Sequence, residues 1–193
     1  MNVSLIPKTI LALVQPAVQA TAARLFVLTT GRAGSANFQP TVTTFYETGL
    51  VTALYEQLLM SPVLAKYEIR HEMPYPGAAG RPKQVDLWLK PVGGGYPHLI
   101  EAGDFAPGKV HSDIRKISPI NAHGGNWFLA FFRNPSHAAD PWAEISRSLQ
   151  RANGLDAVLV EVDRRLTTSF PVYRPNHPPD HFGAALIRAR SVG

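Results

Sequence analysis

Residues 83–102, KQVDLWLKPVGGGYPHLIEA, contain two short apolar segments joined by three consecutive glycines. Residues 83–91 alternate between apolar and other side chains, a pattern typical of a half-buried strand, and Asp86 lies on the side opposite the aliphatic residues. Residues 98–102 form the next predicted strand and carry Glu101. Because a glycine-rich hairpin joins antiparallel neighbours, we expect Asp86 and Glu101 to lie near one another.

The two carboxylates interrupt segments that otherwise favour burial. Ionised carboxylates are rarely buried unless they are paired or bound to a cation. Two carboxylates in one site repel each other and raise each other's pKa, and a hard divalent cation relieves that repulsion. A Mg²⁺ or Mn²⁺ ion held by Asp86 and Glu101 could activate water and neutralise charge in phosphodiester cleavage. The alternative is a structural pair that binds a nearby arginine or lysine.

Further elements are predicted on both sides of this hairpin. Helical spacing and proline or glycine boundaries predict helices over residues 9–30, with a break or kink at Pro16, and over 41–60, 112–120 and 141–153. Apolar runs predict strands over residues 66–75, 126–133, 157–163 and 183–189, and the proline-rich stretch 171–179 is expected to be a loop.

The order of these elements determines the expected fold class. From residue 41 the order is helix, three strands, helix, strand, helix, strand. It predicts an α/β fold with a mixed central sheet flanked by helices. Residues 1–40 are expected to form an N-terminal helical arm and loop, and residues 41–193 the main domain, within a single globular domain overall.

Glu47 extends the pattern of acidic residues. It lies on the apolar face of the helix predicted over 41–60, together with Leu50 and Leu54. Because this face is expected to pack on the sheet, Glu47 could supply a third metal ligand. Glu56 is the alternative, although it lies off that face. A glutamate near a helix N-terminus is also favoured by the helix dipole alone, so a structural role for Glu47 stays open.

A helix with a glutamate, three strands carrying Asp and then Glu, a helix and a strand resemble the core of the PD-(D/E)xK nuclease superfamily, whose fold is restriction-endonuclease-like. The resemblance covers residues 41–133, about half of the chain. It implies an αβββαβ core and metal-dependent hydrolysis of a DNA or RNA backbone. It also implies that Asp86 and Glu101 bind the metal and that Glu47 is the helical glutamate of the family. The residue before the first acid is Val85, where the family usually has proline.

The family's lysine is missing from its usual position. It should stand two residues after the glutamate, where this sequence has Gly103. That lysine is expected to orient the attacking water and to steady developing charge. Lys116 and then Lys109 are the preferred substitutes, and Lys83 is a further candidate. The alternative function is a catalytically inactive member of the fold that binds nucleic acid or another protein.

Other residues allow two interpretations each. Asp104 could be an extra ligand, or a cap or turn residue before the next helix. His111 and His123 could face a phosphate, but as single loop histidines they are expected to be exposed. Trp88 shares the side of Asp86 and is expected to pack on the sheet, with base stacking as the alternative.

The bulk composition is that of one globular domain with a sizeable core: 193 residues, 45% apolar and 17% charged. A net charge of +5 is compatible with DNA or RNA as a partner. The absence of cysteine excludes disulfides, thiolate zinc sites and a cysteine nucleophile. Because no apolar run reaches the roughly 20 residues of a membrane span, we expect no membrane partner and a cytoplasmic location. A secretory signal ending near Ala20 competes with a packed N-terminal helix, and a homodimer or a protein partner stays open.

Overall fold

The computed structural model describes residues 5–30, 40–74, 84–118, 125–152 and 160–189. Its helices are α1 (Leu5–Thr30), α2 (Glu47–Met60), α3 (Pro107–Ile117), α4 (Pro135–Ala138) and α5 (Pro141–Ala152), with 3₁₀ turns η1 (Val42–Thr44) and η2 (Pro62–Leu64). Its strands are β1 (Tyr67–Pro74), β2 (Gln84–Pro91), β3 (His98–Asp104), β4 (Gly125–Phe132), β5 (Val160–Arg174) and β6 (His177–Ala189).

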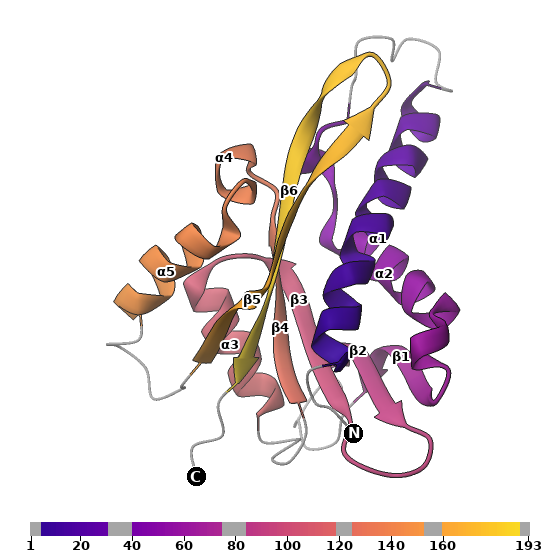
Figure 1. Cartoon of the computed structure of the whole chain (residues 1–193), viewed down its shortest axis with the longest axis vertical. Helices are drawn as coiled ribbons and strands as arrows, with labels where there is room; N and C mark the ends of the chain where they lie inside the picture. The colour runs from indigo at the N-terminus through magenta and orange to yellow at the C-terminus, as the bar shows by residue number, and fades with distance from the viewer. Residues whose placement is uncertain (1–4, 31–39, 75–83, 119–124, 153–159, 190–193) are drawn as a thin grey trace.

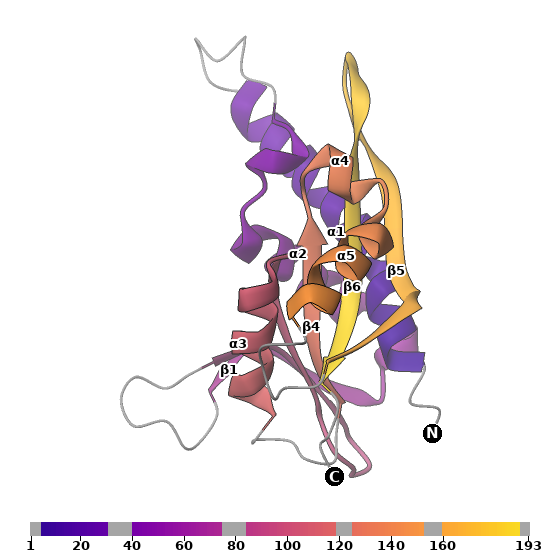
Figure 2. The ribbon, with the colours of Figure 1, turned by 90° about the vertical axis from the view of Figure 1, so that its left-hand side faces the viewer.

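The six strands form one sheet in the order β1-β2-β3-β4-β6-β5. β1, β2 and β3 form an antiparallel meander, β3 and β4 are parallel, and β6 is antiparallel to both β4 and β5. Parallel neighbours need a crossover connection, and α3 lies in that connection. α1 and α2 lie on one face of the sheet, and α3 and α5 on the other (Figures 1 and 2). The predicted mixed sheet flanked by helices is confirmed.

β4 lies in the middle of the molecule and is buried along its whole length. Leu129 and Phe131 join the core shared with α1 and α2, whereas Phe128 and Ala130 join the core under α3 and α5. A strand that is covered on both faces reads as a continuous apolar run, which is the pattern predicted for residues 126–133. The carboxyl ends of β3 and β4 therefore lie side by side between the two helical layers.

Three helices begin at residues other than those predicted, and α1 begins at Leu5 rather than at residue 9. α2 begins at Glu47 rather than Thr41, because the preceding residues form η1, with Thr41 N donating to the Thr44 hydroxyl at 2.9 Å. α3 begins at Pro107 rather than at residue 112, since the fixed φ of proline suits the first helical position. The earlier start of α3 places Lys109 in its first turn.

α1 runs continuously from Leu5 to Thr30 with Pro16 inside it, so the predicted break does not occur. Val14 and Val18 bury the helix in the core that also contains α2 and the sheet, and this packing offsets the backbone donor that proline lacks. Leu5–Thr29 is long and apolar enough to cross a membrane, with a mean hydropathy of 1.5, and 39% of its most apolar window is buried in the protein. The expectation that no apolar stretch has this length was wrong.

β5 and β6 form a long hairpin that extends past the rest of the sheet (Figure 1). The strands predicted over 157–163 and 183–189 are therefore too short, and the loop predicted over 171–179 is wrong, because most of that stretch is in β5 and β6. β6 pairs with β4 only from Gly183 onward, so Pro178 lies where β6 has β5 as its one neighbour. Proline is tolerated in a strand where no ladder hydrogen bond is lost.

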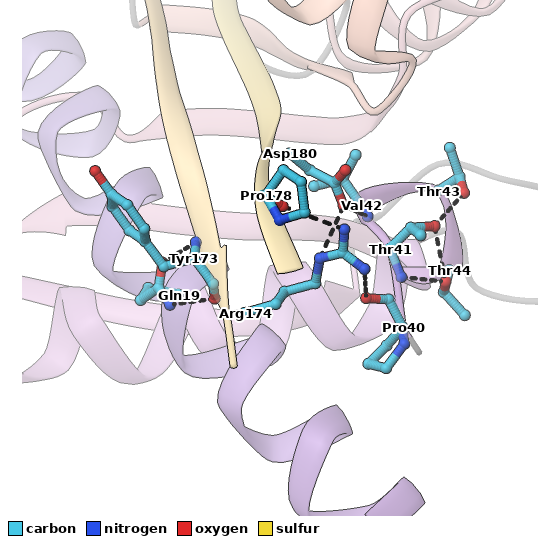
Figure 3. A network of polar contacts seen from close by, with 10 residues as sticks. All are labelled: Gln19, Pro40, Thr41, Val42, Thr43, Thr44, Tyr173, Arg174, Pro178 and Asp180. Atoms are coloured by element: carbon cyan, nitrogen blue, oxygen red, sulfur yellow. Dashed lines mark hydrogen bonds and ion pairs between the residues drawn. The ribbon is translucent and has the colours of Figure 1, made fainter. Parts of the chain in front are cut away.

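A polar network fixes the hairpin, close to its turn, to the N-terminal part of the chain (Figure 3). Arg174 Nε lies 3.3 Å from Asp180 Oδ2, and Arg174 Nη1 donates to the Pro40 carbonyl at 3.1 Å. Asp180 Oδ2 also accepts the Val42 N–H at 3.2 Å. The segment that leads into α2 is thus held by the opposite end of the chain.

Candidate functional site

Asp86 lies near the start of β2, where the pairing of β2 with β3 ends. The last paired residues are Leu87 and Ile100. Asp86 lies one residue before Leu87, beyond the last pair. Its Oδ2 accepts the Ala102 N–H at 2.7 Å, in place of a backbone carbonyl of β2. Burial raises the pKa of Asp86, the Ala102 hydrogen bond lowers it, and the charge of Glu47 raises it, with a net upward shift. The carboxylate therefore occupies the gap between two separating strands.

Glu101 is the acidic residue of β3, and it is 3% exposed. Burial, followed by the charge of Asp86, raises the pKa of Glu101 to about 8. Lys116 Nζ lies 3.3 Å from Glu101 Oε1 and opposes that shift. Oε1 itself is buried and has no hydrogen-bond partner among the residues that the structure describes. The structure thus brings the two predicted acids together in a site where both carboxylates are unfavourably placed as anions.

Gly103 stands where the resemblance expects lysine, and other side chains fill the space beside it. A Cβ on Gly103 would lie 2.6 Å from Glu47 Oε2 and 2.6 Å from Lys109 Cε, and it would overlap Lys109 Nζ. Lys109 Nζ donates to Glu47 Oε2 at 2.6 Å. The amino group of Lys109, carried by α3, therefore occupies the volume that a side chain at position 103 would enter.

Lys116 lies in the last turn of α3, and its amino group contacts the carboxylate of Glu101 on β3. Its Nζ is 3.3 Å from Glu101 Oε1 and 3.2 Å from Asp113 Oδ1. Burial alone would lower the pKa of Lys116, but the carboxylates of Glu101 and Asp113 raise it overall. Asp113 was not predicted as a site residue, although its spacing of three from Lys116 on a helix is a usable sequence signal.

A divalent cation such as Mg²⁺ requires oxygen ligands that converge on one point. Within the described ranges, no group of three or more His, Cys, Asp or Glu side chains converges as a metal site. Mg²⁺, however, usually keeps several waters and binds through one or two carboxylates together with substrate phosphates. The burial of Glu101 and the raised pKa of both acids are features that a bound cation would relieve. Glu47 as a third ligand stays a prediction, since its carboxylate is paired with Lys109.

Asp104 ends β3 and forms an ion pair with Arg133, which directly follows β4. The interpretation of Asp104 as a helix cap is wrong, because the N-cap of α3 is Ala106 and has no side-chain hydrogen bond. Burial lowers the pKa of Arg133, and the charge of Glu47 opposes that shift. Arg133 is a site residue that the sequence interpretation missed; its signal is its place directly after the strand that follows the α3 crossover.

The remaining candidates lie elsewhere. His111 is 4% exposed, so its predicted exposure is wrong, because the earlier start of α3 places it inside the helix. His123 and Lys83 lie outside the described residues. Glu56, the alternative to Glu47, forms an exposed ion pair with Arg24 of α1 at 3.6 Å.

Comparisons with protein-family models, curated proteins and solved structures found no match for this chain. What the site can do therefore follows from its own geometry, which is two raised-pKa carboxylates on adjacent strands, flanked by two lysines of one helix.

Proposed function

We propose that this chain is a metal-dependent nuclease of the PD-(D/E)xK type, which hydrolyses phosphodiester bonds of DNA or RNA. The observation that carries the proposal is the pair of acids Asp86 and Glu101, at the point where two antiparallel strands separate. The order of elements supports it: a helix that begins with Glu47, three antiparallel strands, a crossover helix and a strand parallel to the third. This order matches the αβββαβ core of restriction-endonuclease-like proteins.

Asp86 and Glu101 would hold Mg²⁺ or Mn²⁺ in this site. The bound ion supplies Lewis-acid chemistry, because it polarises a phosphoryl oxygen and makes bound water more acidic. Asp86 is oriented for this role by its hydrogen bond from Ala102 N–H. Glu101 is oriented by Lys116, whose amino group contacts Oε1. Two rigid strands therefore position both ligands.

Lys109 is the residue that we assign to the role of the missing family lysine. Its amino group lies in the space above Gly103, beside the strand that carries Glu101. A lysine side chain at position 103 would have to deliver its ammonium from the same side of β3. Lys116 forms ion pairs with both Glu101 and Asp113, so its role in this proposal is to hold the Glu101 carboxylate in place. In the substrate complex Lys109 would exchange its partner Glu47 for the attacking water or a phosphate oxygen.

The first test is cleavage by the purified chain. Plasmid DNA, single-stranded DNA and RNA are incubated with Mg²⁺ or Mn²⁺, with EDTA and Asp86→Ala as controls. We expect metal-dependent cutting of at least one substrate and its loss in the variant. A direct binding readout is calorimetric titration of Mn²⁺, which should give saturable heat with the wild type and none with Asp86→Ala. Cutting that persists in Asp86→Ala contradicts the assignment of the site.

The second test moves the lysine back to the position where the family carries it. Lys109→Ala should lower the cleavage rate about 100-fold or more, which is the size of effect seen when one donor to developing charge is removed. The double variant Gly103→Lys with Lys109→Ala should recover a measurable part of that loss, because Lys109 no longer fills the space. Lys66→Ala, an exposed lysine between α2 and β1, is the matched control and should cut at the wild-type rate. No recovery in the double variant, with the fold intact, argues against Lys109 in this role.

A second function rests on the same ion pairs. Lys109 and Lys116 form ion pairs with Glu47 and Glu101, at 2.6 Å and 3.3 Å. A chain that kept the fold and lost the reaction would use these pairs for structure, and it would bind nucleic acid or another protein without cutting. This alternative predicts no heat of Mn²⁺ binding and little effect of Asp86→Asn on any binding activity.

A further inference from the structure

A pocket of about 430 Å³ opens at the carboxyl ends of the parallel strands β3 and β4. Its walls come from Asp104 and Phe105 after β3, from Phe132 and Arg133 at the end of β4, and from Thr43 in η1. In open α/β sheets, ligands bind outside the carboxyl ends of parallel strands, where the chain leaves in different directions. The volume lies within the range of small-molecule sites.

The pocket adjoins the carboxylate site. Asp104 is three residues after Glu101 on β3, a separation of about 10 Å at the usual rise of a strand. Arg133 lies close enough to Glu47 for the carboxylate to influence its pKa. Glu47 is in turn paired with Lys109 above Gly103. A continuous row of charged groups therefore leads from the two acids into the pocket.

The chemistry of the walls suits a planar, hydrogen-bonding ring. Phe105 stacks on Phe132 with ring centroids 4.9 Å apart and an interplanar angle of 25°. Phe105 is only half-buried, so its ring offers an aromatic surface to a ligand. Asp104 Oδ1 is buried and has no hydrogen-bond partner among the described residues, so this oxygen could accept a hydrogen bond from an N–H group of a ligand.

The polar groups around this ring-binding surface suit a phosphorylated ligand. Arg133 is 21% exposed and is held by one oxygen of Asp104, so part of its guanidinium fork is available to a second anion. Thr43 presents an exposed hydroxyl at the pocket wall. Aromatic surface, an unpaired acceptor and an arginine together match a nucleoside phosphate better than they match a purely apolar or purely anionic ligand.

We propose that this pocket binds one nucleotide, with the base between Phe105 and Asp104 and a phosphate at Arg133. The inference rests on the proposed nuclease function and names the part of the substrate that the chain recognises: a nucleotide close to the phosphate that Asp86 and Glu101 attack. The nucleotide can belong to a polynucleotide or be a free mononucleotide, and these two sources share the same chemistry.

The test separates nucleotide binding from cleavage. Nucleoside 5′-monophosphates with each of the four bases, inorganic phosphate, and a 5′-phosphorylated single-stranded oligonucleotide are titrated in EDTA, with calorimetry as the readout. Phe105→Leu keeps an apolar side chain but removes the ring, and Arg133→Gln removes the cation. Tyr96→Leu, exposed in the turn between β2 and β3, and Arg165→Gln, exposed on β5, are the matched controls, because neither side chain lines the pocket.

We expect at least one monophosphate to bind more tightly than phosphate, and Phe105→Leu and Arg133→Gln each to weaken it about tenfold or more, with no change in the controls. In these variants, loss of monophosphate binding with unchanged oligonucleotide binding would assign the pocket to a free nucleotide, and parallel losses would assign it to a nucleotide within a strand. No saturable monophosphate or oligonucleotide binding, or equal affinity in Phe105→Leu and wild type, overturns the inference.

The two proposals fail in different ways. Nucleotide binding that depends on Phe105 and Arg133, combined with no cutting of any substrate, supports the pocket and contradicts the nuclease. Metal-dependent cutting with an unchanged KM in both pocket variants and no monophosphate binding contradicts the pocket and leaves the nuclease standing.

Discussion

Two clusters in this molecule each contain an aspartate away from bulk solvent but differ in how the negative charge is compensated. Near the turn of the β5–β6 hairpin, Asp180 contacts the guanidinium of Arg174 and a backbone N–H, and Arg174 also donates to a backbone carbonyl. At the junction of β2 and β3, burial raises the pKa of both Asp86 and Glu101. The charge of Glu47 raises the pKa of Asp86 further, and the charge of Asp86 raises the pKa of Glu101 further.

The difference separates a structural role from a functional one. The hairpin cluster has one acid for one arginine, and its hydrogen bonds tie segments that are distant in the sequence. The β2–β3 cluster has carboxylates that repel each other, and a buried oxygen without a hydrogen bond. Perturbed pKa values concentrate at functional sites, because catalysis and metal binding need groups whose charge is not already compensated. The predictions below change one cluster at a time.

The largest expected effect is on catalysis. Glu101→Gln should lower metal-dependent cleavage about 1,000-fold or more, because it removes a metal ligand worth several kcal/mol of charge stabilisation in the transition state. Single-turnover rates measure it, and circular dichroism checks the fold. Asp180→Asn is the control from the other cluster and should retain its rate. Equal rates for Glu101→Gln and wild type would remove Glu101 from the site.

The next effect is on stability. Asp180→Ala should lower the free energy of unfolding by about 2–3 kcal/mol, because it leaves a largely buried Arg174 without its anion and Val42 N–H without an acceptor. Urea denaturation measures the loss. Asp163→Ala breaks an exposed aspartate–arginine pair on β5 and should cost less than about 1 kcal/mol. A loss of the same size in both variants would show that the hairpin network stabilises the fold no more than an exposed ion pair does.

A smaller effect is expected from one methyl group. Gly103→Ala should lower cleavage about tenfold and change the free energy of unfolding by less than about 1 kcal/mol, since the added Cβ meets only the flexible ends of Lys109 and Glu47. Gly93→Ala, at a position with open space around it, is the matched control. Steady-state kinetics and urea denaturation test the pair. If Gly103→Ala unfolds the protein, the space above this residue has a structural purpose.

The remaining expected effect is a dependence of stability on pH. Glu101 ionises near its ordinary pKa of 4.5 when unfolded and at about 8 when folded. Between these values the unfolded chain binds fewer protons, so the free energy of unfolding of the metal-free protein should fall as pH rises from about 5 to about 8. The raised pKa of Asp86 acts in the same direction. Urea titrations of wild type and Glu101→Gln should give a flatter slope for the variant, and a steeper one would contradict the sign.

The sequence predicted the part of the fold that rests on local patterns. The strands β1 to β4 and the positions of both acids on them follow from alternation and from a buried apolar run, and the structure has them within a few residues. The start of α3 was missed because Pro107 favours the first helical turn more strongly than the serine and aspartate at residues 112 and 113 favour a cap.

Long-range features could not be obtained in this way. The proline-rich stretch 171–179 looked like a loop because local rules penalise proline in strands, whereas the unpaired side of β6 removes that penalty. The pairing of Asp104 with Arg133 and the place of Lys109 above Gly103 depend on how α3 and β4 pack on β3. No spacing within the sequence encodes those distances.

Hydrogen bonds join α1 to the β5–β6 hairpin, although the two bonded residues are 154 positions apart in the sequence. Gln19 Nε2 donates to the Tyr173 carbonyl at 3.2 Å, and Tyr173 N donates back to Gln19 Oε1 at 3.4 Å (Figure 3). On the ribosome α1 is synthesised well before β5, which covers part of its apolar face. Contacts of such large sequence separation slow folding, and uncovered apolar surface on a nascent chain attracts chaperones or other nascent chains. The burial of α1 is therefore completed only after β5 has been synthesised.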